Sequence, residues 1–176
     1  NLKTKLIGKI QIKNLLMSIL AASNSNIKLN KILKSVENIK AVPGRLEKVG
    51  NLKNNSIAIL DYAHTPDALE TCILNIKEHF KHRKINLVFG CGGDRDKSKR
   101  SIMGRIANNL CDKIYLTDDN PRTESPKKIR NTIKAKILQS KLVEIPSRKK
   151  AIEKAIKDLR SDEVLIVAGK GHENYQ

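Results

Sequence analysis

The fold is decided by one polar stretch, Thr117-Asp118-Asp119-Asn120-Pro121-Arg122-Thr123-Glu124-Ser125-Pro126. The apolar run before it, residues 113–117, predicts a buried strand, and the amphipathic run after it predicts a helix. Ligands of open α/β sheets bind at the carboxyl ends of strands, which is where this stretch would lie. Its two carboxylates, its amide and the Arg122 guanidinium suit a zwitterion such as an amino acid. The alternative is an ordinary polar turn, since Asp and Asn are common at turn positions.

The same strand, turn and helix pattern repeats on both sides of this stretch. Helix starts are predicted at Thr65 as N-cap with Pro66 after it, at Ser125-Pro126, and at Ser147. The apolar runs between the helices are continuous, which favours a mainly parallel sheet covered by helices on both faces, an α/β fold. The predicted strands are residues 56–61, 86–90, 113–117, 141–145 and 163–168.

The first forty residues have a different pattern. Apolar positions in residues 11–23 have helical spacing, and Asn30 is a candidate cap for a second helix. The Pro43-Gly44 pair then ends the helical pattern. We therefore predict a boundary near residues 38–44, with a helical segment (residues 1–40) before an α/β unit (residues 41–176). The chain begins at Asn1 rather than Met, and we expect it to be a fragment of a longer protein.

Composition excludes several classes of protein. No apolar run reaches 18 residues and no signal peptide is visible, so we expect neither a transmembrane helix nor membrane binding. Three cysteines show no CxxC pairing, and we expect buried free thiols in a reducing cytoplasm rather than a zinc site.

The net charge of +17 leaves two interpretations open. A basic protein can bind nucleic acid, but here the 35 Lys and Arg residues are spread along the chain without a basic-aromatic surface for stacking bases. The other interpretation is a smaller anionic partner such as a nucleotide.

Every polar cluster follows a predicted strand. The clusters are residues 61–64, 90–95, 118–122 and 169–173, and they would gather on one edge of a parallel sheet. Asp61 and His64 could contact a nucleotide, act as an acid–base pair or cap local structure. The glycines of residues 90–93 could cradle a phosphate or allow close backbone packing.

Two further features remain ambiguous. Arg45 follows the Pro-Gly pair at the predicted boundary, where it could reach a phosphate or simply pair with Glu47. The loop that begins at Gly169 is not a P-loop, because GxxxxGK[ST] is absent from the chain. His172 has no partner at metal-ligand spacing, so we predict no metal site on protein ligands.

Taken together, these loops resemble the Mur ligase family, most closely its diaminopimelate-adding members. The motifs occur in the family's order over nearly the whole chain, and residues 1–40 look like the end of the family's central ATPase domain. The motifs are Val42-Pro43-Gly44-Arg45-Leu46-Glu47, Asp61-Tyr62-Ala63-His64-Thr65-Pro66-Asp67-Ala68-Leu69, Phe89-Gly90-Cys91-Gly92-Gly93-Asp94-Arg95-Asp96-Lys97, Lys99-Arg100 with Met103-Gly104, Thr117-Asp118-Asp119-Asn120-Pro121-Arg122-Thr123 and Val167-Ala168-Gly169-Lys170-Gly171-His172-Glu173.

The resemblance implies a Rossmann-like C-terminal domain of a ligase that uses ATP and Mg²⁺ to join meso-diaminopimelate to UDP-MurNAc-L-Ala-D-Glu through an acyl phosphate. Arg122 separates this substrate from lysine, because only diaminopimelate has a distal carboxylate. The implied diaminopimelate contacts are Arg95, Asp119, Asn120, Arg122, Gly169 and Glu173, and the implied ATP contacts are Arg45, Asp61 and His64.

The resemblance also shows what these residues lack. The family's UDP-binding domain, P-loop and metal-bridging lysine are not in the sequence, so ATP and Mg²⁺ would be bound mainly by a missing central domain. We assign no catalytic residue within the chain and expect it to be inactive alone. We expect a cytoplasmic monomer that does not bind nucleic acid. The open alternatives are a relative that adds lysine or another amino acid, and a basic nucleic-acid-binding module.

Overall fold

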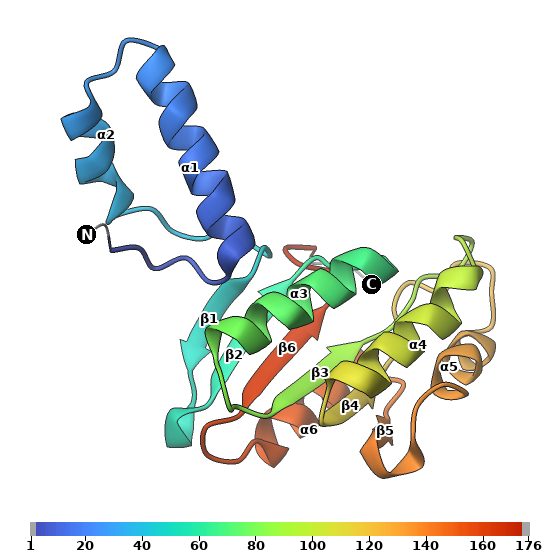
Figure 1. Ribbon diagram of the computed structural model, residues 1–176. Coiled ribbons are helices and arrows are strands. Elements are labelled where there is room, and N and C mark those ends of the chain that lie inside the picture. Colours follow the sequence, from blue (N-terminus) through green and yellow to red (C-terminus); the bar gives the residue numbers. More distant parts are fainter. Residues whose placement is uncertain (1–2, 174–176) are drawn as a thin grey trace.

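A computed structural model describes residues 3–173 and shows a six-stranded sheet with helices on both faces (Figure 1). The strand order is β1-β2-β6-β3-β4-β5, and only β1 runs antiparallel to its neighbour. The mainly parallel α/β sheet is therefore confirmed. The strands are β1 (Glu47–Asn51), β2 (Ile57–Asp61), β3 (Ile85–Phe89), β4 (Lys113–Leu116), β5 (Leu142–Glu144) and β6 (Val164–Ala168).

The edge strand β1 was not predicted. Its sequence is polar and has no apolar alternation, and its pairing with β2 shifts register between Lys48 and Gly50. An edge strand of this kind is short, charged and irregular, which discourages pairing with other chains. Its formation depends on β2 as a partner and not on a pattern of its own.

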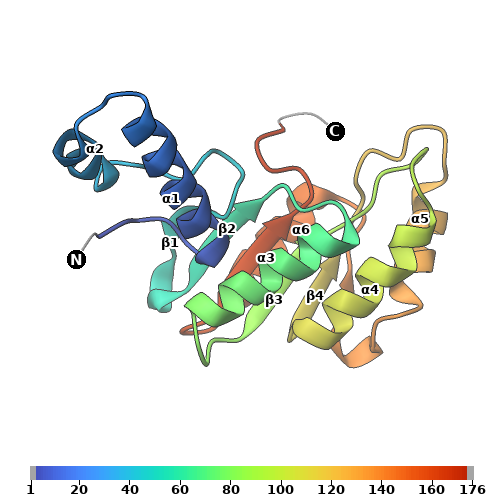
Figure 2. The same cartoon turned by 45° about the horizontal axis from the view of Figure 1, so that its top comes forward.

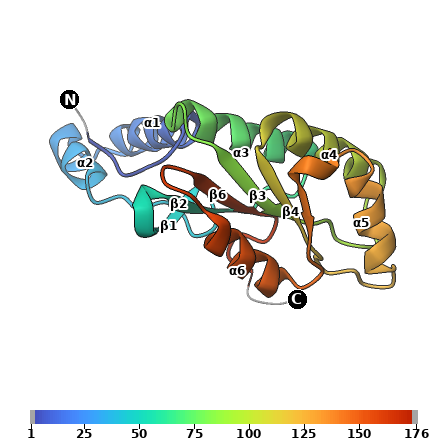
Figure 3. The same cartoon turned by 90° about the horizontal axis from the view of Figure 1, so that it is seen from below.

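Helices cover the two faces of the sheet unequally. Figure 3 shows α6 below the sheet, with α3 and α4 above it. The larger core cluster lies with α3, α4 and α5, and the smaller one lies under α6, where Ala151 and Ala155 pack with Val88, Tyr115 and Leu165. The helices are α1 (Lys9–Asn24), α2 (Leu29–Val36), α3 (Pro66–His79), α4 (Ser98–Leu110), α5 (Pro126–Lys134) and α6 (Arg148–Asp158), with 3₁₀ turns η1 (Lys53–Asn55) and η2 (Gln139–Lys141).

Side-chain caps confirm two predicted helix starts. The Thr65 hydroxyl accepts a hydrogen bond from Ala68 N, and the Ser147 hydroxyl accepts one from Lys150 N. The prediction that Asn30 caps α2 was wrong, because α2 already begins at Leu29 and Lys28 is its N-cap residue. The apolar series of α5 also continues beyond the helix, which ends at Lys134 before the buried Ile137.

The α1–α2 segment extends away from the sheet (Figure 1). α1 buries none of its residues, and Leu16, Met17 and Leu20 are exposed. Residues 3–8, the described segment before α1, have no regular secondary structure but are anchored to the sheet, because Ile7 belongs to the main core cluster. The division into residues 1–40 and 41–176 stays a prediction, and residues 1–2 and 174–176 of those ranges lie outside the described part.

Two expectations from composition can be compared with the structure. Within residues 3–173, no helix is long and apolar enough to cross a membrane. Cys72, Cys91 and Cys111 are buried free thiols, as predicted.

Candidate functional site

The loops after β2, β3, β4 and β6 converge at one edge of the sheet, toward the top of Figure 2. They enclose a cavity of about 640 Å³, which we call the rim cavity. All six residues implied for diaminopimelate binding line it, namely Arg95, Asp119, Asn120, Arg122, Gly169 and Glu173. His64, Lys99 and Asp96 also line it, so the cavity carries charges of both signs.

The Arg122 side chain is held by backbone carbonyl groups of its own loop and of the loop after β3. Its Nη1 donates to Gly93 O at 2.8 Å and more weakly to Asn120 O at 3.4 Å. Arg122 has a φ of 53°, in the left-handed region that few non-glycine residues adopt. Backbone strain of this kind clusters at functional sites, where surrounding contacts enforce it. These two hydrogen bonds use one guanidinium nitrogen, Nη1, so the other nitrogens can donate to a carboxylate.

The glycines after β3 pack against the loop after β4. Gly93 N donates to Asn120 O at 2.9 Å, and a Cβ at Gly93 would lie 1.8 Å from Pro121 O. A Cβ at Gly90 would lie 2.2 Å from Thr117 O. These contacts support the close-packing interpretation of the glycine loop, since side chains there would push the two loops apart.

An ion pair between the buried Arg100 and the half-buried Glu124 fixes the outer ends of the same two loops. Arg100, from α4, reaches Glu124 with Nη2–Oε1 and Nη1–Oε2 distances of 2.7 and 3.0 Å. Glu124 Oε1 also accepts from Asp94 N at 2.7 Å. The hydrogen bonds from Arg100 and then from Asp94 N lower the pKa of Glu124 to about 2. The bidentate pair therefore holds the Arg122 loop in place from behind.

Cations support Asp119 from below the rim cavity. The buried Lys170 ammonium lies 3.7 Å from Asp119 Oδ1 and 3.4 Å from Asn120 Oδ1. Arg148 is also buried, and its Nη2 donates to Ala168 O at 2.9 Å at the end of β6. Burial lowers the pKa of Arg148, and the charge of Asp119 partly opposes that effect. Lys170 and Arg148 therefore place positive charge behind Asp119.

Glu173 is held by Tyr62, from the loop after β2. The Tyr62 hydroxyl donates to Glu173 Oε1 at 2.9 Å. The Tyr62 ring lies edge-on to His64, with centroids 4.8 Å apart, and the His64 Nδ1 is 2.9 Å from Tyr62 O. His64 therefore lines the rim cavity and does not line a second cavity, which contains the other two implied ATP contacts.

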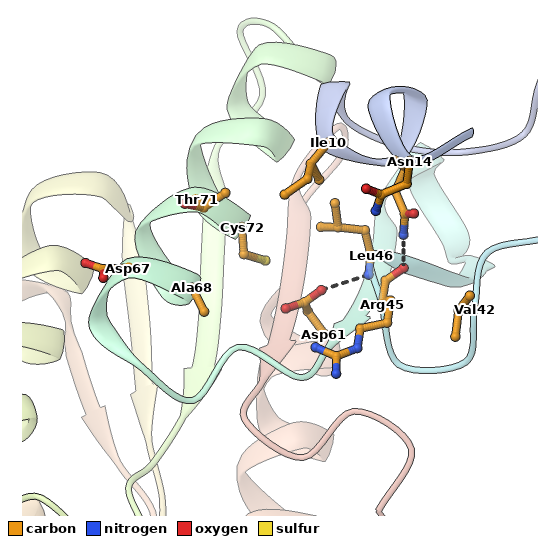
Figure 4. A pocket seen from close by; sticks show the side chains of 11 residues that line it. Ile10, Asn14, Val42, Arg45, Leu46, Asp61, Asp67, Ala68, Thr71 and Cys72 are labelled. Carbon is orange, nitrogen blue, oxygen red and sulfur yellow. Dashed lines mark hydrogen bonds between the residues drawn. The ribbon is translucent and has the colours of Figure 1, made fainter. Parts of the chain in front are cut away.

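That second cavity, of about 600 Å³, lies between α1 and α3 (Figure 4). We call it the α1–α3 cavity. Arg45 and Asp61 line it together with Ile10 and Leu46, and Gln11 Nε2 donates to Arg45 O at 2.8 Å. Its lining combines the aliphatic side chains of Ile10, Val42, Leu46 and Ala68 with the Arg45 guanidinium and the carboxylates of Asp61 and Asp67.

The hydrogen bonds of Asp61 support the structural interpretation of this residue. Its Oδ2 accepts from Leu46 N and its Oδ1 accepts from Ala63 N, both at 2.8 Å. Glu47 is not paired with Arg45, since its Oε2 accepts from Gly44 N at 2.7 Å and the Arg45 guanidinium lies over the Tyr62 ring. Asp61 thus fixes the turn that carries Arg45.

Sequence reasoning missed several residues that line the rim cavity or lie behind it. Lys99 and Tyr62 were inside quoted motifs but had no role assigned, and Lys170 and Arg148 had no signal beyond their charge. Only folding reveals that the last two are buried beneath Asp119. In the described part of the chain, no group of three or more His, Cys, Asp or Glu side chains could hold a metal ion.

Known proteins resemble this chain in sequence and fold. The Rickettsia felis UDP-N-acetylmuramoyl-L-alanyl-D-glutamate--2,6-diaminopimelate ligase is 45% identical over 174 residues, which cover 98% of this chain and 32% of that protein. A solved structure of a ligase with the same name is 35% identical, with a TM-score of 0.74, covering 99% of this chain and 36% of that one. The chain therefore spans about a third of the length of these relatives.

A more distant neighbour shows the fold alone. It is the Mycobacterium tuberculosis folylpolyglutamate synthase complexed with ADP and AMPPCP, at 16% identity and a TM-score of 0.75, covering 96% of this chain and 39% of that one. The family description "Mur ligase, glutamate ligase domain" matches residues 44–171, which contain every strand of the sheet and all the residues that line the rim cavity except Glu173. The chain belongs to the Mur ligase family.

Proposed function

We propose that this chain is the amino-acid-binding part of an ATP-dependent ligase that adds meso-diaminopimelate to UDP-MurNAc-L-Ala-D-Glu in peptidoglycan synthesis. The observation that carries the proposal is the placement of Arg122 and Glu173. They come from loops after different strands, and both line the rim cavity. The printed names of two similar proteins, the Rickettsia felis ligase and the ligase of known structure, support the same substrates.

The charges of the rim cavity complement diaminopimelate. This substrate has two carboxylates and two ammonium groups. Arg122 and Arg95 offer guanidinium groups to carboxylates, whereas Asp119 and Glu173 accept from ammonium groups. Lysine would leave one guanidinium without a carboxylate, and an unpaired charged group in a cavity costs binding free energy.

The chemistry explains why two sites are needed. A carboxylate is a poor electrophile at neutral pH, so ATP supplies the phosphoryl group that turns it into an acyl phosphate. The amine bound in the rim cavity then attacks the acyl carbon, and phosphate leaves. This chain would orient the amine and exclude water, which can account for much of the rate.

Arg45 is the residue that would reach the nucleotide from this chain. It lies at the α1–α3 cavity on a turn fixed by Asp61. The phosphate-binding loop is absent from the sequence, and the carboxylates in the described residues form no metal site, so both would come from other residues of the full-length protein. We accordingly expect the 176-residue chain to show no ligase turnover alone. Turnover by the purified chain would contradict this part of the proposal.

Replacing Arg122 tests the substrate assignment in the full-length enzyme. Arg122→Ala removes a charge-assisted contact worth about 1.5–3 kcal/mol, and because the side chain is exposed we expect the lower end, roughly a tenfold rise in KM for diaminopimelate. Arg105→Ala is the matched control, since it removes an exposed guanidinium from α4 outside both cavities.

Calorimetry with diaminopimelate and with lysine completes the test. We expect the wild-type enzyme to bind diaminopimelate more tightly. Preference for lysine would favour the lysine-adding relative instead. The nucleic-acid alternative rests only on the net charge of +17, and it would require a DNA band shift that persists at physiological salt. The monomeric state and the cytoplasmic location stay predictions.

A further inference from the structure

Tyr62 contacts a charged group of each cavity. Its ring lies under the Arg45 guanidinium, whose Cζ is 4.7 Å from the ring centroid, and Arg45 lines the α1–α3 cavity. Its hydroxyl donates to Glu173 Oε1 at 2.9 Å, and Glu173 lines the rim cavity. A single half-buried side chain thus joins the proposed nucleotide side to the proposed amino-acid side.

The backbone segments around Tyr62 are closely packed against one another. A Cβ at Gly44, the residue before Arg45, would lie 2.5 Å from His172 N, and a Cβ at Gly171 would lie 2.9 Å from Tyr62 Cβ. The His172 ring also stacks on Tyr62, with centroids 5.8 Å apart. The turn that carries Arg45 therefore touches the loop that carries Glu173, backbone against backbone.

These contacts differ in strength. The contact between an exposed guanidinium and a ring is weak, whereas a guanidinium forms short paired hydrogen bonds with a phosphate. A phosphate in the α1–α3 cavity would draw Arg45 away from the ring. The Tyr62 hydroxyl would then donate to Glu173 from a ring that has lost its contact with Arg45.

We propose that Tyr62 is a positioning residue that sets the orientation of Glu173 and couples occupancy of the two cavities. The inference rests on the proposed function of both sites. Its hydroxyl orients the Glu173 carboxylate toward the substrate ammonium, and its ring transmits the position of Arg45. Coupling of this kind is reciprocal, so each ligand changes the affinity for the other by the same factor.

The test uses the full-length enzyme and three variants. Tyr62→Phe keeps the ring contact with Arg45 and removes the bond to Glu173. Tyr62→Leu removes both. Tyr115→Phe is the matched control, because it removes a buried tyrosine hydroxyl that bonds to Asp158 at 2.8 Å and lies at neither cavity. Thermal melting shows whether each variant is folded.

The kinetic result expected for Tyr62→Phe is a roughly tenfold rise in KM for diaminopimelate, with kcat near wild type and a smaller change, about threefold, in the KM for ATP through the lost coupling. Tyr62→Leu should raise both KM values. Tyr115→Phe should leave both unchanged even if its melting temperature falls. A purely structural role for Tyr62 predicts instead that KM follows melting temperature across all three variants, and that pattern would overturn the inference.

Calorimetry measures the coupling directly. Diaminopimelate is titrated into wild-type enzyme with and without a non-hydrolysable ATP analogue, and we expect the two dissociation constants to differ by about threefold or more. In Tyr62→Phe this difference should disappear, whereas equal coupling in the variant and the wild type would refute the role. If wild-type enzyme binds no diaminopimelate under either condition, the proposed function itself fails, and the inference fails with it.

Discussion

Gly93 offers the sharpest test of how the rim cavity is built. An alanine Cβ at this position would lie 1.8 Å from Pro121 O, and Cβ contacts under 3.0 Å are essentially never found. The loop after β4 must therefore move by more than about 1 Å, and this loop carries Asn120 and Arg122. Overpacking of this kind costs about 1–3 kcal/mol, partly offset by the lower entropy of the unfolded alanine chain.

The consequences for Gly93→Ala follow from that displacement. A net decrease of about 1–2 kcal/mol in the free energy of unfolding should lower the melting temperature by roughly 2–8 °C for a domain of this size. A shift of about 1 Å in substrate-positioning groups can reduce turnover by roughly a hundredfold. We therefore expect kcat/KM for diaminopimelate to fall far more than stability alone would cause.

Circular-dichroism melting and steady-state kinetics on the full-length enzyme measure both effects. Gly50→Ala is the matched control, because a Cβ there meets nothing within 4 Å, and we expect its stability to stay within about 0.5 kcal/mol of wild type. Wild-type melting and wild-type kcat/KM in Gly93→Ala would refute the claim that contact between these two loops shapes the cavity.

Two further predictions concern titratable groups. Arg100 lowers the pKa of Glu124 to about 2 from a usual 4.5. The folded protein therefore binds this proton less readily than the unfolded chain does. The stability that this ion pair contributes should be complete above about pH 4.5 and should decline as the pH falls toward 2. Urea midpoints measured between pH 6 and 3 should fall less in Glu124→Gln than in wild type, and equal slopes would contradict the assignment. Burial raises the pKa of Cys91 to about 11 and of Cys111 to about 12, so both thiols should react slowly with a thiol reagent at pH 8 and rapidly in denaturant. Rapid labelling of the native protein would show that these thiols are accessible.

The periodic parts of the fold were predictable because they depend on local patterns. Strands β2, β3, β4, β5 and β6 are apolar runs, and the caps at Thr65 and Ser147 are local hydrogen bonds between neighbours in the chain. β1 was not predictable in this way, because it has a polar sequence and exists only through its pairing with β2.

The candidate site likewise has a part that could be predicted from the sequence and a part that could not. The polar loops could be assigned to one edge of the sheet from the sequence, because the carboxyl ends of parallel strands lie together. The contacts between loops could not be assigned, since they join residues far apart in the chain, such as Arg100 with Glu124 and Tyr62 with Glu173. Burial of Lys170 beneath Asp119 also depends on the packing of all these loops together.

The sequence by itself determined the alternation of strands and helices, the family, and the identity of the charged groups at the carboxyl edge of the sheet. Each of these depends only on residue type and spacing along the chain. Only the tertiary structure decided that Arg45 and Asp61 face one cavity while His64 and Glu173 face another, with Tyr62 between them. The physical reason is that side chains a few residues apart point in different directions once a strand ends, and their partners come from loops that meet only when the sheet has formed.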